Sequence, residues 1–208
     1  MYELEATADV LVMTGQGKPA IDRRHLEVPP QQSAELESRE SMLISAVLAG
    51  NHDLFGSLYQ LYAPLVHGVL LARLPRSEVE DLVQDIFLHA LRKLHTLRDA
   101  NAFGPWIAMI ARNRAMDFHR KSRETVSVDE CTENLQSRDS GESKAEEILA
   151  IIRTLPEAYR ETLVLRLVEG MTGAEIATRT GLTAASVRVN LHRGMKLLRT
   201  KLGFKEGL

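Results

Sequence analysis

The chain has 208 residues, of which 44% are hydrophobic and 5% aromatic, and its formal net charge is −2. This length allows one or two domains, and the scarcity of aromatic side chains predicts aliphatic cores like those of helical bundles. The single cysteine, Cys131, excludes a disulfide framework and a zinc site built on cysteine pairs. The N-terminus has no signal-peptide pattern, and no apolar run approaches the roughly 18 residues of a membrane span. We therefore expect a cytoplasmic protein without membrane insertion.

Residues 1–35 form the first predicted segment. They lack sustained hydrophobic periodicity, contain two glycines and three prolines, and carry more acids than bases. This composition predicts a disordered N-terminal extension. Two interpretations remain for it, an acidic tail that shields a basic surface or an extension that results from an upstream start codon.

Helical periodicity predicts a first domain over residues 36–121. Within its second helix, Pro64 interrupts the apolar pattern and is expected to kink or split the helix. The third helix is expected to begin at a capping box formed by Ser77 and Glu80. The fourth, from Gly104 to Lys121, carries more bases than acids and is the first basic helix of the chain.

A polar segment, residues 122–143, follows this domain. It holds six acids and two arginines, a composition that cannot bury enough apolar surface to order itself. A connection of this length without structure of its own marks a domain boundary or a functional segment. We expect a flexible acidic linker.

Residues 144–208 form a second predicted domain, which ends in a helix-turn-helix. Thr172 and Glu175 have the spacing of a capping box, which satisfies two backbone donors at a helix start. Gly181 can adopt the left-handed conformation that ends a helix. Thr183 is then a good N-cap for the helix that follows.

The last predicted helix has an apolar stripe and a basic face. Val187, Leu191, Gly194 and Leu198 follow the helical period. Residues 184–202 contain five bases and no acid, and such a helix, entered through a glycine turn, suits the major groove of DNA. A solvated helix on another bundle is the alternative, but the paired caps favour the helix-turn-helix. The expected fold is all-α, with a helical bundle and a helix-turn-helix domain joined by the linker.

Several motifs together resemble a known family. The chain is similar to bacterial RNA polymerase sigma factors of the extracytoplasmic-function type, over roughly Leu36 to Leu202. Each motif alone is moderately specific, whereas their order and spacing together are highly specific. The motifs are Asp81-Leu82-Val83-Gln84-Asp85-Ile86-Phe87, Phe103-Gly104-Pro105-Trp106-Ile107, Ile110-Ala111-Arg112-Asn113, Leu155-Pro156, Leu165-Arg166 with Val168-Glu169-Gly170, Ala174-Glu175-Ile176-Ala177 and Leu191-His192-Arg193.

The resemblance implies a non-catalytic protein that directs promoter-specific transcription initiation. The first domain would correspond to sigma region 2, which binds the clamp helices of the largest subunit of core RNA polymerase and recognises and melts the promoter −10 element. The second would correspond to region 4, which reads the −35 element as duplex, and the linker would extend toward the polymerase cleft. An anti-sigma factor is an implied partner, and neither a cofactor nor a metal is implied.

The resemblance also implies roles for residues of the first domain. Asp81, Gln84 and Asp85 would contact the polymerase. The alternative is that these three residues form a solvated helix face. The loop of His95, Thr96, Leu97 and Arg98 would take a flipped base of the −10 element. Asn113 would read a base edge, or is simply a residue of the helix surface. Phosphate contacts would come from Arg112, Arg114, Arg120 and Lys121.

In the second domain the last helix would read the −35 element. Arg188 is the preferred base reader, because Arg to guanine is the commonest specific contact, and Val189 could touch a thymine methyl group. For Arg193 and Lys196, contact with bases and contact with phosphates both remain as interpretations. Val189, Asn190 and Met195 depart from the residues common in the family. The full predicted −35 surface is Thr183, Ser186, Arg188, Val189, His192, Arg193 and Lys196.

Two other functions compete with this interpretation. A plain DNA-binding regulator, with the first domain as a dimerisation or sensing module, leaves the motif from Asp81 to Phe87 and the basic helix around Arg112 unexplained. An enzyme is disfavoured because the seven histidines are scattered, without metal-ligand spacing or a nucleophile pattern.

Overall fold

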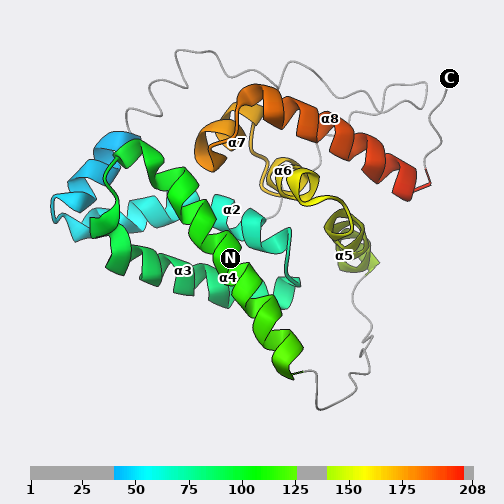
Figure 1. Ribbon diagram of the computed structural model, residues 1–208, viewed down its shortest axis with the longest axis horizontal. Helices are drawn as coiled ribbons and strands as arrows, with labels where there is room; N and C mark the ends of the chain where they lie inside the picture. Colours follow the sequence, from blue (N-terminus) through cyan, green and yellow to red (C-terminus); the bar gives the residue numbers. More distant parts are fainter. Residues whose placement is uncertain (1–39, 126–139, 204–208) are drawn as a thin grey trace.

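The computed structural model describes residues 40–125 and 140–203, and this part of the chain contains helices and no strand (Figure 1). The predicted N-terminal extension, Cys131 and the middle of the predicted linker lie outside the described residues. A helix at 40–48 comes first. The elements that follow are η2 (His52–Leu54), α2 (Phe55–Leu71), η3 (Arg76–Glu78), α3 (Val79–Lys93), η4 (Leu94–Thr96), η5 (Ala100–Ala102), α4 (Phe103–Thr125), α5 (Ser140–Arg153), α6 (Glu157–Leu167), α7 (Gly173–Thr180) and α8 (Ala184–Lys201).

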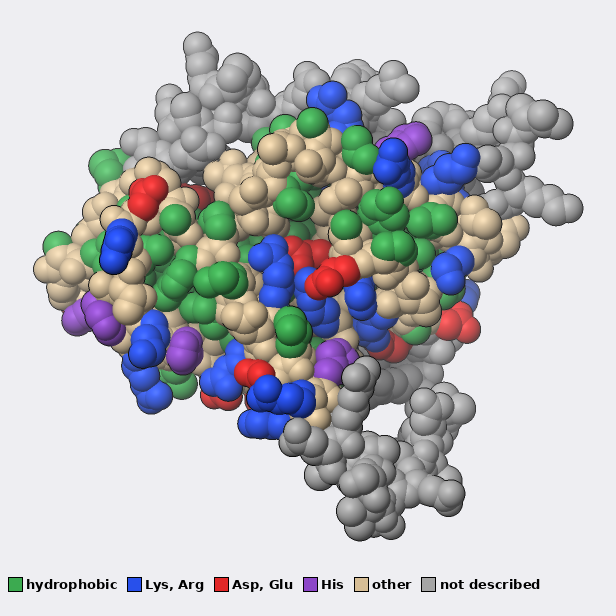
Figure 2. All heavy atoms as spheres, viewed as in Figure 1, with side chains coloured by type: hydrophobic (Ala, Val, Ile, Leu, Met, Phe, Trp, Pro, Cys, Tyr) green, Lys and Arg blue, Asp and Glu red, His purple; other side chains and the backbone are tan. Residues whose placement is uncertain are grey.

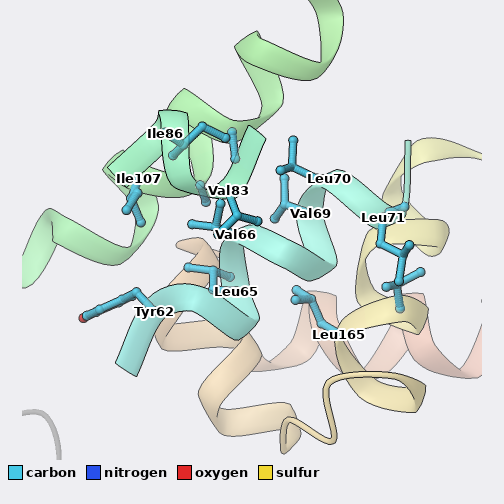
Figure 3. Close-up of a cluster of buried hydrophobic side chains, with 14 of the residues drawn as sticks. Tyr62, Leu65, Val66, Val69, Leu70, Leu71, Val83, Ile86, Ile107 and Leu165 are labelled. Carbon is cyan, nitrogen blue, oxygen red and sulfur yellow. The ribbon is translucent and has the colours of Figure 1, made fainter. Parts of the chain in front are cut away.

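Helix α2 is the centre of the first domain, and α3 and α4 pack against it. Figure 3 shows Leu65, Val66 and Val69 of α2 beside Ile86 of α3 and Ile107 of α4. All five side chains are buried. The aliphatic core that the composition predicts is therefore built around one helix.

Two local expectations in the first domain need correction. Pro64 does not split its helix, because α2 runs unbroken from Phe55 to Leu71, and the expected kink stays a prediction. Ser77 is not a cap: it lies within η3, and α3 begins after Glu78 without a side-chain cap. The turn that follows Pro75 bonds the Glu78 amide to the Pro75 carbonyl at 3.1 Å, which places Ser77 inside the turn.

Residues 52–71 form a segment that is long and apolar enough to cross a membrane, by length and composition alone. The expectation that no apolar run approaches the length of a membrane span is wrong for this segment. Eight residues of α2 are buried in this structure. Its apolar character is accounted for by its position at the centre of the core.

In the second domain, the helix-turn-helix forms as predicted. Thr172 and Glu175 form the capping box, and the Glu175 amide donates to the Thr172 hydroxyl at 3.2 Å. Gly181 ends α7 with a φ of 76°, in the left-handed region. Thr183 caps α8 by accepting a hydrogen bond from the Ser186 amide at 3.1 Å. All three signals act within one turn of backbone, which is why they could be read from sequence.

The helices extend into both ends of the predicted linker. Helix α4 ends at Thr125 and α5 begins at Ser140, whereas the predicted linker covers 122–143. The acidic composition of the segment thus does not stop helix formation at its borders.

The two domains pack against each other, which the sequence did not predict. Helix α2 contacts α6, and α4 contacts α7. Leu165 of α6 lies in the same buried cluster as Leu65 and Val69 of α2 (Figure 3). The hydrophobic core is therefore continuous from the first domain to the second.

Candidate polymerase and nucleic-acid interfaces

Helix α3 has an inner and an outer face. Its inner side chains, among them Val83, Ile86 and Phe87, are buried. Asp81, Gln84 and Asp85 are all exposed, and no side-chain hydrogen bond or ion pair joins them to the described parts of the chain. The structure therefore brings the three predicted polymerase contacts together on one free surface.

Leu88 extends this surface and was missed in the sequence. It lies one turn beyond Gln84 and Asp85, and 54% of it is exposed. A leucine three and four residues after polar positions belongs to their helix face, and this spacing was the available signal. The outer face of α3, defined as Asp81, Gln84, Asp85 and Leu88, thus has an apolar residue beside three polar ones.

The loop after α3 places its four predicted residues differently. His95, Thr96 and Arg98 are exposed, and the Thr96 hydroxyl donates to the Lys93 carbonyl at 2.7 Å. Leu97 is only 9% exposed and belongs to the core. Leu97 thus anchors the loop in the core of the free chain, and its predicted contact with a flipped base stays a prediction.

Helix α4 exposes Asn113 on its outer side. Met109 and Met116, one turn before and after it, are 50% and 66% exposed. Arg120 is also exposed and pairs with Asp117 at 3.1 Å. Asn113 thus lies between two exposed methionines on the open face of α4. Of the other predicted phosphate contacts, Lys121 is exposed and Arg114 half-buried.

Arg112 is bound to the second domain. Its Nε and Nη2 atoms donate to the two carboxylate oxygens of Glu161, at 3.0 and 2.7 Å. Arg73 of the first domain donates to the same carboxylate at 2.6 Å. Burial alone would raise the pKa of Glu161, but hydrogen bonds and charge from Arg112 and Arg73 lower that pKa below its usual value. The structure therefore holds Arg112 in an ion pair, and its predicted phosphate contact stays a prediction.

Glu161 is the main residue of this contact that the sequence did not predict. It is 7% exposed and opens a run of five buried residues in α6 that ends at Leu165. In the sequence Glu161 stands between Arg160 and Thr162, so no local pattern marks it as buried. In Figure 2 acidic and basic side chains adjoin at the centre of the visible face, between the positions of α4 and α6 in Figure 1.

Helix α8 presents the predicted −35 surface to solvent. Val187, Gly194 and Leu198 are buried against the domain, and Figure 2 shows basic and histidine side chains along the position of α8. Thr183 and Ser186 contact each other at 2.8 Å through their hydroxyl groups, so both serve the cap. The exposed predicted residues are Thr183, Ser186, Arg188, Val189, His192, Arg193 and Lys196.

Close packing under α8 fixes its orientation. A Cβ atom added to Gly194 would lie 3.0 Å from Leu163 Cδ1 and 3.1 Å from Tyr159 Cβ, both in α6. The absence of a side chain at Gly194 lets the two helices approach closely, and the basic face of α8 consequently points outward. Within the described residues, no cluster of three or more histidine, cysteine or acidic side chains could hold a metal ion.

Both domains match known sequence families. The Sigma-70 region 2 family matches residues 58–125, and the Sigma-70 region 4 family matches residues 145–198. The first match contains the outer face of α3 and the whole of α4. The second contains the helix-turn-helix.

Whole proteins of known function are similar as well. The RNA polymerase sigma factor CarQ of Myxococcus xanthus is 34% identical over 161 residues, which cover 74% of this chain and 92% of CarQ. The extracytoplasmic-function sigma factor BldN of Streptomyces coelicolor is 29% identical over 80% of this chain and 67% of BldN.

Solved structures share the fold. The structure of CnrH in complex with the cytosolic domain of CnrY covers 79% of this chain and 97% of CnrH, with a TM-score of 0.57 and 23% identity. The sigma factor RpoE of Bartonella quintana, solved with the anti-sigma factor NepR, has a TM-score of 0.52 and 18% identity over 73% of this chain and 98% of RpoE. Given both domain matches and a relative aligned over nearly its whole length, this chain belongs to the extracytoplasmic-function sigma factors and directs promoter-specific transcription initiation by RNA polymerase.

Proposed function

We propose that the chain docks on the clamp helices of core RNA polymerase through the outer face of α3. It then presents the open face of α4 to the −10 element and the basic face of α8 to the −35 element, and helps to melt the promoter. It supplies recognition and no catalytic chemistry of its own. Its place of action is the cytoplasm, where polymerase and promoter meet.

The observation that carries this proposal is the two-sided construction of α3. Asp81, Gln84 and Asp85 are exposed beside Leu88, while the opposite side of the helix is buried in the core. Protein–protein interfaces combine apolar and polar side chains in this way. Leu88 therefore joins the three predicted contacts in the proposed polymerase surface.

Two separate surfaces support the DNA contacts. Asn113 can donate and accept hydrogen bonds at a base edge, and it lies on the open side of α4. Arg188, Val189 and His192 are exposed on α8, the second helix of a capped helix-turn-helix, which is the helix that enters the major groove in this motif.

An anti-sigma factor is a further proposed partner. The Bartonella quintana RpoE structure is a complex with such a factor, and this chain shares its fold. The exposed leucine on α3 is the kind of surface that a protein inhibitor would cover. This part of the proposal is tested separately, by recovering proteins that bind the full chain and release it when core polymerase is added in excess.

Run-off transcription tests the main proposal. Purified chain, core polymerase and a library of promoter fragments should yield transcripts that start at a fixed distance from a shared two-part motif. Replacement of Leu88 by Ala should weaken polymerase binding without changing helix content. Replacement of the exposed Met42 by Ala, on the helix at 40–48, should leave polymerase binding unchanged. DNA binding without polymerase binding or transcripts would support the plain regulator instead.

A further inference from the structure

We propose that the two domains clasp each other in the free chain, and that Glu161 occupies Arg112 in place of a promoter phosphate until the clasp opens. The proposal rests on the proposed role of Arg112 at the −10 element. The clasp is defined here as the contact of α2 and α4 with α6 and α7.

The charged centre of the clasp is a buried carboxylate between two arginines. The Arg112 guanidinium meets the Glu161 carboxylate through two parallel hydrogen bonds, at 3.0 and 2.7 Å. This is the bidentate geometry with which arginine also binds phosphate. Glu161 occupies the Nε–Nη2 edge of the guanidinium, and its carboxylate neutralises the charge that would attract a phosphate, so a phosphate at that edge would have to displace Glu161.

Arg73 closes the other side of the carboxylate. Its side chain is 7% exposed and donates from Nη2 to Glu161 at 2.6 Å and to Glu157 at 2.8 Å. Glu157 is 65% exposed, whereas Glu161 is 9% exposed as a side chain. A buried charge without its partner is strongly unfavourable, so Glu161 ties α6 to α4 and to the turn directly after α2, while Glu157 contributes only from the rim.

Helix α2 approaches the second domain at a glycine. A Cβ atom added to Gly68 would lie 2.6 Å from Leu165 Cδ2 and 2.9 Å from Glu169 Cγ. Beside it, His67 Nδ1 and Glu169 Oε1 are 2.6 Å apart. The two domains therefore fit closely at this point, and the contact combines apolar packing with a second charged pair.

Helices α4 and α7 form an independent second contact. A Cβ atom added to Gly104 would lie 2.9 Å from the Arg179 carbonyl oxygen. The Arg179 side chain pairs with Glu40 at 3.1 Å and lies 5.6 Å from the centre of the Tyr62 ring. Backbone from one domain therefore rests directly on backbone from the other, so the arrangement is a specific fit.

The clasp is selective in what it covers. The outer face of α3, Asn113 on α4 and the basic face of α8 all remain exposed. Arg112 and the start of α4 at Gly104 are covered by the second domain. The closed chain thus offers its proposed polymerase surface while one proposed promoter contact is occupied, and opening must precede full engagement of the −10 element.

The first test measures the distance between the domains in the full chain. Spin labels are attached at Ser77→Cys and Thr200→Cys, both exposed positions outside the clasp, in a chain that also carries Cys131→Ser. We expect one narrow distance distribution, and Glu161→Gln should broaden and lengthen it. Glu157→Gln is the matched control, because it removes the same charge from the same helix at an exposed site, and it should leave the distribution narrow.

A broad distribution in the parent chain would overturn the clasp, and a narrow one in Glu161→Gln would overturn the role of Glu161 in holding it closed. Promoter binding gives a second measurement on the same variants. If the parent chain is open one time in ten, Glu161→Gln should bind promoter DNA about tenfold more tightly, since apparent affinity scales with the competent fraction. Unchanged affinity in an opened variant would show that Glu161 does not compete with DNA.

The second test locks the clasp, so it does not depend on how well Glu161→Gln folds. The Cβ position at Gly68 lies 2.9 Å from Glu169 Cγ and 3.5 Å from its Oε1, which places the two Cβ atoms within about the 3.5–4.5 Å that a disulfide spans. Gly68→Cys with Glu169→Cys, in the Cys131→Ser chain, should lose run-off transcription when oxidised and regain it on reduction. The Cys131→Ser chain alone is the control for oxidation.

Full transcription by the disulfide-linked chain would reject the clasp as an inhibitory contact. Silence of the parent chain under all conditions would instead reject the proposed function, and the spin-label distances would still decide whether the domains are closed. The two proposals therefore fail in different measurements.

Discussion

The two basic helices of this protein, α4 and α8, use their arginines in opposite ways. On α8, Arg188 and Arg193 are exposed. On α4, Arg112 has 29% of its side chain exposed and donates from Nε and Nη2 to Glu161. Both helices look alike as strings of basic residues. The comparison teaches that a basic helix predicts where DNA can bind, whereas the acids that fold against it decide which of its arginines are available.

The largest expected effect is on stability, from removal of the acid that distinguishes the two helices. Glu161→Ala leaves two arginines without their shared partner, and loss of one side of a buried ion pair is worth about 3–5 kcal/mol. Urea unfolding measures the loss. Glu157→Ala, at an exposed site, should change the free energy of unfolding by less than about 1 kcal/mol. Equal effects from both variants would contradict the distinction between buried and rim acids.

Paired arginine variants sharpen the comparison directly. Arg112→Ala should lower the free energy of unfolding by about 1–3 kcal/mol, because it removes charge-assisted hydrogen bonds from Glu161. Arg188→Ala should leave unfolding unchanged and weaken −35 binding by about 1–3 kcal/mol. Thermal unfolding and promoter binding are measured on both chains. A stability loss in Arg188→Ala would place that side chain in a structural role.

Salt dependence separates base from phosphate contacts on α8. If Arg193 neutralises a phosphate, Arg193→Ala should reduce the slope of log K against log salt by about 0.9. If it reads a base, the variant should relax sequence preference at one position of the site. Binding titrations at several salt concentrations, on matched and mismatched −35 duplexes, distinguish the two. A slope and a preference that both stay unchanged would remove Arg193 from the interface.

The smallest expected effect is a pH dependence in the domain contact. The hydrogen bond to Glu169 raises the pKa of His67; burial and Arg76 oppose this, while the charges of Glu169 and Glu80 support it. The pKa in the folded chain is thus higher than in the unfolded chain. The stabilisation is complete below the unfolded pKa, about 6.5, and is lost as pH rises through the folded value.

His67→Gln should remove this dependence. The difference in unfolding free energy between parent and variant is expected to stay below about 1 kcal/mol and to shrink as the pH is raised above 6.5. Urea unfolding at a series of pH values measures it. A difference that grows toward alkaline pH would reverse the sign assigned to the His67–Glu169 pair.

The sequence predicted those features that depend on neighbouring residues. Thr172, Gly181 and Thr183 each act within one turn, so the helix-turn-helix was predictable. The predicted cap at Ser77 was wrong because Pro75, two positions earlier, starts a turn that includes Ser77. Periodicity also placed Asp81, Gln84 and Asp85 on one face, and the structure exposes all three.

The contact between the domains could not be predicted in this way. Arg112 and Glu161 are 49 residues apart, and Arg73 and Glu161 are 88 apart. Neither separation leaves a periodic trace, and each residue alone is compatible with a solvated surface. The burial of Leu97 could not be predicted for a related reason, since motif position shows that a loop is present but not which of its side chains turns inward.

The residue at position 68 determines how closely the two domains can approach each other. A single methyl group there would push aside Leu165 and Glu169, both flexible side chains, while alanine would favour helix α2 by about 1 kcal/mol relative to glycine. One substitution could therefore strengthen the helix and loosen the joint at once. Selection for a sigma factor that responds more readily would need no new charge and no new partner, only one carbon atom at this position.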